Sequence, residues 1–237
     1  MNQAKRFTAL ALLMCSAQMI FARFDRTEKT KWTDSFLEDK ADLVNRGKNP
    51  FFVLEPGYYL VLEGAEDGKK TELRITVLGE VKKIDGVETR IVEERETQDG
   101  LVIEISRNFF AISKRTNSVY YFGEDSKEYK DGRAVNQKGS WEAGVNGARF
   151  GLIMPGTVLL GARYHQEIAP QVAMDRAENV STSEVVQVPA GTFQGCLKME
   201  ETTPLETRSK EYKYYTPGIG LVRDGELRLT RYGYLRD

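Results

Sequence analysis

The sequence has few of the residues on which most catalytic and metal sites depend. Its 237 residues include one histidine, His165, and two cysteines, Cys15 and Cys196. A single histidine excludes a multi-histidine metal site, and the lack of a CxxC pair excludes the common zinc and redox motifs. P-loop, nucleophile-elbow, zinc-protease and dinucleotide-binding motifs are also missing. We therefore expect no metal and no cofactor, and the sequence assigns no catalytic residue.

An excess of one charge is lacking as well. Lys and Arg total 34, Asp and Glu total 35, and the basic residues form no stripe that could follow a phosphate backbone. Nucleic acid is therefore not expected as a partner. Beyond the N-terminal segment no apolar run is long enough to span a bilayer, so we expect no integral membrane span in the mature chain.

The N-terminal segment 1–22 is typical of a secretory signal peptide. Lys5 and Arg6 precede an uncharged, mostly apolar stretch that ends before Arg23. A short positive region followed by an apolar region and a small residue marks a cleavable export signal. We predict cleavage after Ala22 and an exported protein, either periplasmic or extracellular.

Three alternatives remain open for this segment. Cleavage after Ala17 would also leave a small residue at the cut. The segment could instead stay attached as an N-terminal anchor helix. Cys15 follows Leu12-Leu13-Met14, which is similar to a bacterial lipobox, although Met14 stands where that motif has Gly, Ala or Ser. Lipoprotein anchoring through Cys15 is the third alternative.

One helix is predicted within residues 23–48, after a polar lead-in. Ser35 and Glu38 have the spacing of a capping box, in which each side chain bonds the backbone N–H of the other. Apolar residues continue at helical spacing: Phe36, Leu37, Ala41 and Val44. Gly47 supplies a stop signal. No linker rich in Ser, Pro or charge divides the rest, so 49–237 is predicted to be one β-domain.

The β assignment depends on alternation and on turn chemistry. Apolar and polar residues alternate within 72–77, as in a strand with one buried face. Asp-Gly or Asn-Gly, the strongest short-range hairpin signal, begins at residues 67, 85, 99, 131, 146 and 224. The predicted strands are 58–65, 70–78, 87–97, 101–112, 118–124, 133–140, 162–168, 178–188, 193–203, 208–215, 219–223 and 226–234.

This pattern predicts a mainly β fold with the one N-terminal helix. About a dozen strands are too many for an open flat sheet, so a single antiparallel sheet is expected to curve into a barrel or half-barrel. The stretch 148–160 interrupts the strands and is predicted to be an apolar loop.

Three stretches carry a resemblance to a known family: 120–129, 139–144 and 211–222, the last with the pattern YxYYxPGxGLV in the C-terminal hairpin. They resemble a family of secreted bacterial β-proteins of unknown function, which implies no particular activity. In architecture alone, the layout is also similar to the lipoprotein-carrier half-barrel, a curved antiparallel sheet with a helix and an apolar hollow.

Most other candidate groups have a structural interpretation. His165 could act as a base, but we interpret it as a partly exposed strand residue. Cys196 is interpreted as a shielded strand residue. Glu94 and Glu96 lie two apart and therefore share one face of a strand, which we interpret as a wet face with Lys and Arg partners on neighbouring strands.

The aromatic residues point to a ligand cavity, because rings with a polar tip suit its wall or mouth. They are concentrated on predicted strands and strand ends. The predicted ligand-binding residues are Trp141, Glu142, Tyr120, Tyr164, Tyr214, Leu152 and Met154.

Taken together, these features favour an exported cell-envelope protein. Its curved sheet is predicted to bind an apolar or amphipathic small molecule, or an acylated partner protein. One alternative is an enzyme without a cofactor that uses the same cavity. A second alternative is an interaction or structural module that has no ligand.

Overall fold

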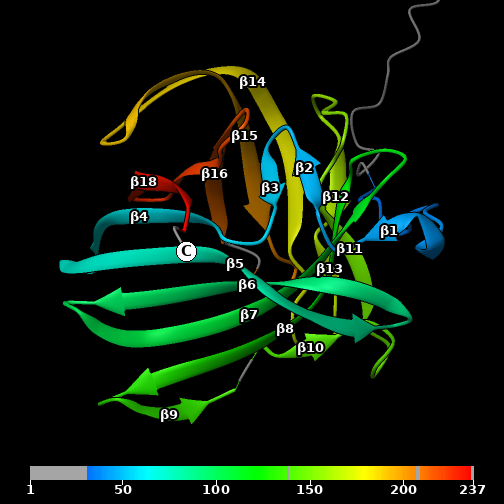
Figure 1. Cartoon of the computed structure of the whole chain (residues 1–237), viewed down its shortest axis with the longest axis horizontal. Helices are drawn as coiled ribbons and strands as arrows, with labels where there is room; N and C mark the ends of the chain where they lie inside the picture. The colour runs from blue at the N-terminus through cyan, green and yellow to red at the C-terminus, as the bar shows by residue number, and fades with distance from the viewer. Residues whose placement is uncertain (1–30, 138, 207–208, 236–237) are drawn as a thin grey trace, which may run out of the picture. The chain divides into compact units, whose positions relative to one another are not determined.

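The computed structural model describes residues 31–137, 139–206 and 209–235 (Figure 1). The predicted signal peptide, its alternative cleavage sites and Cys15 lie outside the described residues. Among the described residues, none of the helical structure is long and apolar enough to cross a membrane.

The described chain is built almost entirely of β-strands. In order they are β1 (Leu43–Val44), β2 (Gly47–Asn49), β3 (Phe52–Leu54), β4 (Tyr58–Glu66), β5 (Lys69–Ile84), β6 (Val87–Gln98), β7 (Leu101–Ser113), β8 (Val119–Lys130), β9 (Arg133–Asn136), β10 (Trp141–Glu142), β11 (Arg149–Met154), β12 (Arg163–His165), β13 (Glu167–Ile168), β14 (Arg176–Val188), β15 (Gly191–Thr202), β16 (Lys210–Thr216), β17 (Gly220–Asp224) and β18 (Leu227–Tyr234).

One large antiparallel sheet contains all of these strands except β2 and β3. Its order is β12-β14-β15-β16-β17-β18-β4-β5-β6-β7-β8-β11-β13, and β1, β9 and β10 pair at its margins. The two end strands, β12 and β13, are separated in sequence only by Gln166. One bent segment thus pairs with β14 on one side and β11 on the other, and the sheet curves until it is nearly closed into a barrel.

Turn chemistry and bulges shape the sheet. The Asp-Gly turns at 67, 85, 99 and 131 have positive φ at both residues, and so does Asn146-Gly147. This is the type I′ geometry that the sequence predicts, and its twist matches the strands it joins. Register shifts interrupt several ladders, as between Val77 and Val81 of β5, and such bulges bend a strand.

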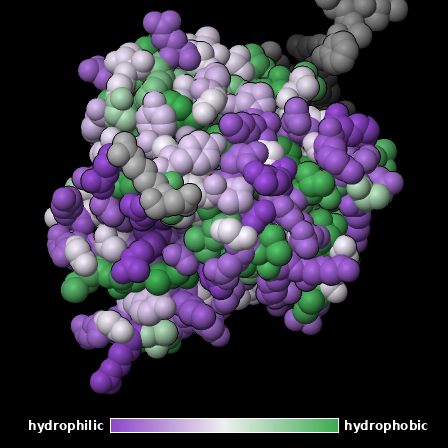
Figure 2. Space-filling view, in the orientation of Figure 1, coloured by the Kyte–Doolittle hydropathy of each residue, from purple (hydrophilic) through white to green (hydrophobic). Residues whose placement is uncertain are grey.

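The outer and inner faces of the sheet differ in character. On the face shown in Figure 2, hydrophilic and hydrophobic residues are interspersed. The inner face carries buried apolar residues, among them Leu62, Val92 and Leu229, which are in register with the inward-facing Leu73 and Val77 of β5 or with one another. Curvature of the sheet brings strands from its two halves opposite one another, and their inward side chains enclose the hollows described below.

The predicted N-terminal helix is wrong. Residues 35–39 form no regular secondary structure, and a short 3-10 turn at Lys40–Asp42 is the only helical element among the described residues. Leu37 is 99% exposed, whereas the Phe36 ring packs edge-on against Tyr120 at 5.9 Å. The Glu38 carboxylate accepts hydrogen bonds from Ser113 and Tyr120 instead of capping a helix. Tertiary contacts with the sheet therefore outweigh the local helical pattern.

The predicted loop at 148–160 is wrong in part. Residues Arg149–Met154 form β11, which pairs with β8 and β13. The stretch is short and mostly apolar, and such a run lacks the alternation by which half-buried strands are recognised.

Candidate functional site

The inner face of the sheet encloses an aromatic cavity of about 120 Å³. Its wall is mostly aromatic and aliphatic, and the described residues that form it include Phe51, Phe52, Tyr58, Tyr59, Leu60, Ile75, Val77, Val92, Phe110, Tyr215 and Leu221. An empty apolar cavity of roughly 150 Å³ is large enough to hold benzene. The aromatic cavity therefore has room for a ring or a short alkyl segment.

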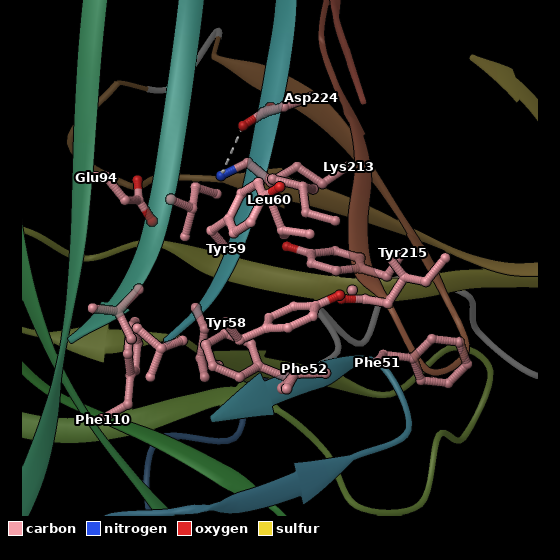
Figure 3. Close-up of a pocket in the computed structure, with 18 of the residues that line it drawn as sticks. Phe51, Phe52, Tyr58, Tyr59, Leu60, Glu94, Phe110, Lys213, Tyr215 and Asp224 are labelled. Atoms are coloured by element: carbon pink, nitrogen blue, oxygen red, sulfur yellow. Dashed lines mark hydrogen bonds and ion pairs between the residues drawn. The ribbon is translucent and has the colours of Figure 1, made fainter. Parts of the chain in front are cut away.

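The β2–β3 hairpin closes one side of this cavity, as Figure 3 shows for Phe51 and Phe52. The Phe52 ring meets Phe110 of β7 edge-on, with 5.2 Å between ring centroids. The Tyr58 hydroxyl donates a hydrogen bond to the backbone oxygen of Ile219 at 2.9 Å, across the wall. These contacts fix the rings of the wall without filling the space between them.

Charged groups lie at one end of the aromatic cavity. Lys213 of β16 forms ion pairs with Glu201 at 2.9 Å and Asp224 at 3.6 Å. Burial alone would lower the pKa of Lys213, but the two carboxylates raise it well above its usual value, so it stays charged. Figure 3 shows Glu94 on the neighbouring wall, at the same end as the Lys213–Asp224 pair.

Glu94 is the unusual group of this site. Within the described chain its side chain has no hydrogen-bond or ion-pair partner, although it lines the aromatic cavity beside Ile75. Burial raises the pKa of Glu94 to about 7, and Lys213 only partly opposes this effect. Burial also raises the pKa of Glu96 to about 7, and Glu66 and Glu104 add to the rise. Both carboxyl groups therefore titrate near neutral pH.

An acidic cavity of about 350 Å³ adjoins the aromatic one and shares Leu73, Glu94 and Asp224 with it. Seven carboxylate residues line it: Glu66, Glu94, Glu96, Glu104, Glu124, Glu211 and Asp224. Glu104 accepts hydrogen bonds from the hydroxyls of Ser106 at 2.8 Å and Ser126 at 2.7 Å. The described residues that line this cavity include no Lys or Arg.

Burial is the main cause of a raised pKa in six of the seven carboxyl groups of this cavity. Burial raises the pKa of Glu124, opposed by a hydrogen bond from Ser106. Burial raises the pKa of Asp224 and Glu211 as well, and Lys213 opposes the rise in both. Nevertheless, no three carboxylate, thiol or imidazole groups in the described ranges are placed to hold a metal ion. The carboxylates are spread along the wall.

A third cavity of about 430 Å³, here called the Trp141 cavity, shares Glu124 with the acidic one. Trp141 is 7% exposed and packs edge-on against Tyr121 at 5.2 Å. Its indole Nε1 is buried and has no hydrogen-bond partner among the described residues. Glu142 also lines this cavity and pairs with Lys82 at 2.5 Å.

The structure brings together only two of the predicted ligand-binding residues, Trp141 and Glu142. Tyr120 and Met154 are buried in the core, and Leu152 is half-buried and packs against it. The remaining two lie elsewhere on the sheet. Tyr164 is buried and donates a hydrogen bond to Asn179 at 3.0 Å, and Tyr214 lies beneath the Lys198 and Arg223 side chains. None of these five is among the described residues that line the three cavities.

The two lone reactive residues also lie outside these cavities. His165 is half-buried, and burial together with Arg176 lowers its pKa. Cys196 is fully buried, and burial raises the pKa of its thiol, which keeps it protonated. Neither group is positioned to act on a molecule in the hollow.

Glu94 and Glu96 are the site residues that the sequence interpretation misplaced. They do share one face, as predicted, but that face lines the hollow and is not the outer, wet one. The register of β6 against β5 is the feature that reveals the face on which the two carboxylates lie. Glu94 pairs with Ile75 and Glu96 with Leu73, and both partners are inward-facing apolar residues of β5. Residues directly opposite in an antiparallel pair point to the same face.

Comparison of the chain with protein-family models, with curated proteins and with solved structures finds no match in any of the three. The fold and the cavities are thus the basis for any assignment of function.

Proposed function

We propose that this is an exported cell-envelope protein that binds an apolar or amphipathic ligand, free or attached to a partner, in the hollow of its curved sheet. The observation that carries the proposal is the aromatic cavity on the inner face. A sheet built only for stability would fill this space, because cores pack to the density of organic crystals.

The chemistry of the wall supports this choice of ligand. Small-molecule sites are concave and mostly apolar, with a few polar groups that orient the guest. The aromatic cavity has this composition: apolar side chains from β3 to β7 and β16–β17, with Glu94, Lys213 and Asp224 at one end. Export is supported by the N-terminal segment 1–22, in which a short positive region precedes an uncharged apolar stretch.

Binding of an uncharged single-ring probe, toluene, measured by isothermal titration calorimetry, tests the proposal. We expect saturable binding to the wild-type protein. Replacing Ile75, which lines the aromatic cavity, in the variant Ile75→Trp should fill the space and weaken binding by at least about tenfold. The matched control is Thr76→Trp, whose side chain points to the other face of β5.

Equal probe binding by the wild-type protein and Ile75→Trp would contradict the proposal, provided that both proteins show the same circular dichroism spectrum. Weakened binding in Thr76→Trp to the same extent would also count against it, because the effect would then not arise in the cavity.

One observation favours a second candidate, a cofactor-independent enzyme. Glu94 lies in an apolar wall with its pKa raised by burial to about 7. A carboxyl group with a pKa near working pH is suited to general acid–base catalysis. In this candidate Glu94 would exchange a proton with the bound ligand.

The two candidates differ in what happens to the ligand. If Glu94 is a general acid or base, incubation with a metabolite and lipid extract of the host should deplete one compound with the wild-type protein and not with Glu94→Gln. The binder alone should deplete no compound by turnover. Identical extracts after incubation with the two proteins would eliminate the enzyme candidate.

A further inference from the structure

We infer that the ligand of the hollow is an amphipathic cation, with its apolar part in the aromatic cavity and an ammonium or guanidinium head group against the carboxylates of the acidic cavity. This inference rests on the proposed function and adds the charge of the ligand to it.

The wall of the acidic cavity carries an excess of negative charge. The seven carboxylate residues of the acidic cavity face no Lys or Arg among its described lining residues. The cation next to them, Lys213, is already paired with Glu201 and Asp224. A buried carboxylate without a counter-ion is unfavourable, and a guest cation would supply the missing charge.

Two carboxylates of the acidic cavity lack a partner among the described residues. Glu94 and Glu96 lie two apart on β6, on the inner face, and neither side chain has a hydrogen-bond or ion-pair partner in the part of the chain that the structure describes. By contrast, Glu104 is held by two serine hydroxyls. The two open carboxylates are therefore available as acceptors for the N–H groups of a guest.

The aromatic and acidic cavities adjoin one another. Leu73, Glu94 and Asp224 belong to both linings, so a molecule with one apolar and one cationic end can occupy both. The wall on the aromatic side also suits a cation at the junction, because ring faces such as those of Tyr58 and Tyr215 attract ammonium groups.

An independent observation at the far end also points to a guest. Trp141 is more than nine-tenths buried, it lines the Trp141 cavity, and its indole N–H has no acceptor among the described residues. Buried donors are almost always paired. Glu124, which lies directly opposite Trp141 in the β10–β8 pair, lines both this cavity and the acidic one, so the unpaired indole donor adjoins the carboxylate wall.

A matched series of three eight-carbon probes tests the inference: octylamine, 1-octanol and octanoate, measured by isothermal titration calorimetry at pH 8. The three share one tail and differ in head-group charge. We expect octylamine to bind at least about tenfold more tightly than 1-octanol, which corresponds to one charge-assisted hydrogen bond. Octanoate should bind most weakly, because its charge repels the wall.

Two variants locate the effect. In the double variant Glu94→Gln, Glu96→Gln, octylamine should lose its advantage, so that the ratio of its affinity to that of 1-octanol falls to about one. The matched control is Glu93→Gln, which removes a carboxylate from the other face of the same strand and should leave the advantage intact. Circular dichroism of each variant verifies the fold.

Each result of these titrations either supports or overturns the inference. Equal affinities for octylamine and 1-octanol would overturn the cation inference while the proposed apolar binding stands. Tighter binding of octanoate, or an octylamine advantage that survives in the double variant, would overturn it as well. Failure of all three probes to bind would overturn the proposed function and, with it, this inference.

Discussion

Glu94 makes the stability of this protein depend on pH in the direction opposite to that of an ordinary surface carboxylate. Its pKa is raised to about 7 in the folded protein, from a usual value of 4.5. Between these two pH values the folded state holds a proton that the unfolded state has lost. The free energy of unfolding therefore falls as pH rises through this range.

The size of the effect follows from the shift. Each pKa unit corresponds to about 1.4 kcal/mol, so between pH 5 and pH 8 the titration of Glu94 removes about 3 kcal/mol from the stability of the fold. The contribution is fully present below pH 4.5 and is lost as pH rises through about 7. This is a large part of the 5–15 kcal/mol by which a typical domain is stable, on the order-of-magnitude scale.

Urea unfolding at pH 5, 6, 7 and 8 measures this contribution when wild type is compared with Glu94→Gln. The variant cannot titrate, so its stability should fall less over this range, by about 3 kcal/mol. The variant Glu93→Gln, on the other face of β6, should follow the wild type. A Glu94→Gln variant that keeps the full pH dependence of the wild type would refute the assignment of this carboxyl group to a buried wall.

Two further predictions concern the margins of the site. Gly123→Ala places a Cβ 2.5 Å from the backbone oxygen of Trp141, so it should displace β10 and lower the free energy of unfolding by about 1–3 kcal/mol. The control Gly79→Ala, whose Cβ would have nothing within 4 Å, should change the free energy of unfolding by less than about 0.5 kcal/mol. Equal effects of the two variants in urea unfolding would contradict this prediction. Phe36→Ala should lower the free energy of unfolding by about 2 kcal/mol, because it removes the ring contact with Tyr120. Leu37→Ala should lower it by less than about 0.5 kcal/mol. If residues 35–47 formed an amphipathic helix, the two variants would have similar effects.

Much of the sheet could be predicted from the sequence, because the determining signals are local. The type I′ turns require positive φ at two successive residues, which Asp-Gly and Asn-Gly tolerate best, and the long hairpins follow from these turns. The turn at Asp224 differs, since only Gly225 has positive φ. Asp224 itself stays in β17, where its carboxylate pairs with Lys213 inside the hollow.

The predictions that were wrong concern segments whose structure depends on contacts between residues far apart in the sequence. Phe36 and Glu38 belong to a helical pattern in sequence, but their partners lie on β7 and β8, more than seventy residues away. Likewise, β11 is recognisable as a strand only from its pairing with β8 and β13.

The site itself was the least predictable feature. Which face of β6 carries Glu94 depends on its register with Ile75, and whether that face is wet depends on how far the sheet curves. The aromatic residues that line the cavity, such as Tyr58 and Phe110, are distinguished from buried Tyr120 only by the three-dimensional arrangement.

The most direct test of the central claim is native mass spectrometry of the protein purified gently from its own host. The account predicts a co-purifying small molecule that carries an amine or guanidinium group and an apolar part, and that is lost in Ile75→Trp but retained in Thr76→Trp. A wild-type protein whose mass equals that of the polypeptide alone, with no bound molecule under conditions that preserve the fold, would contradict it.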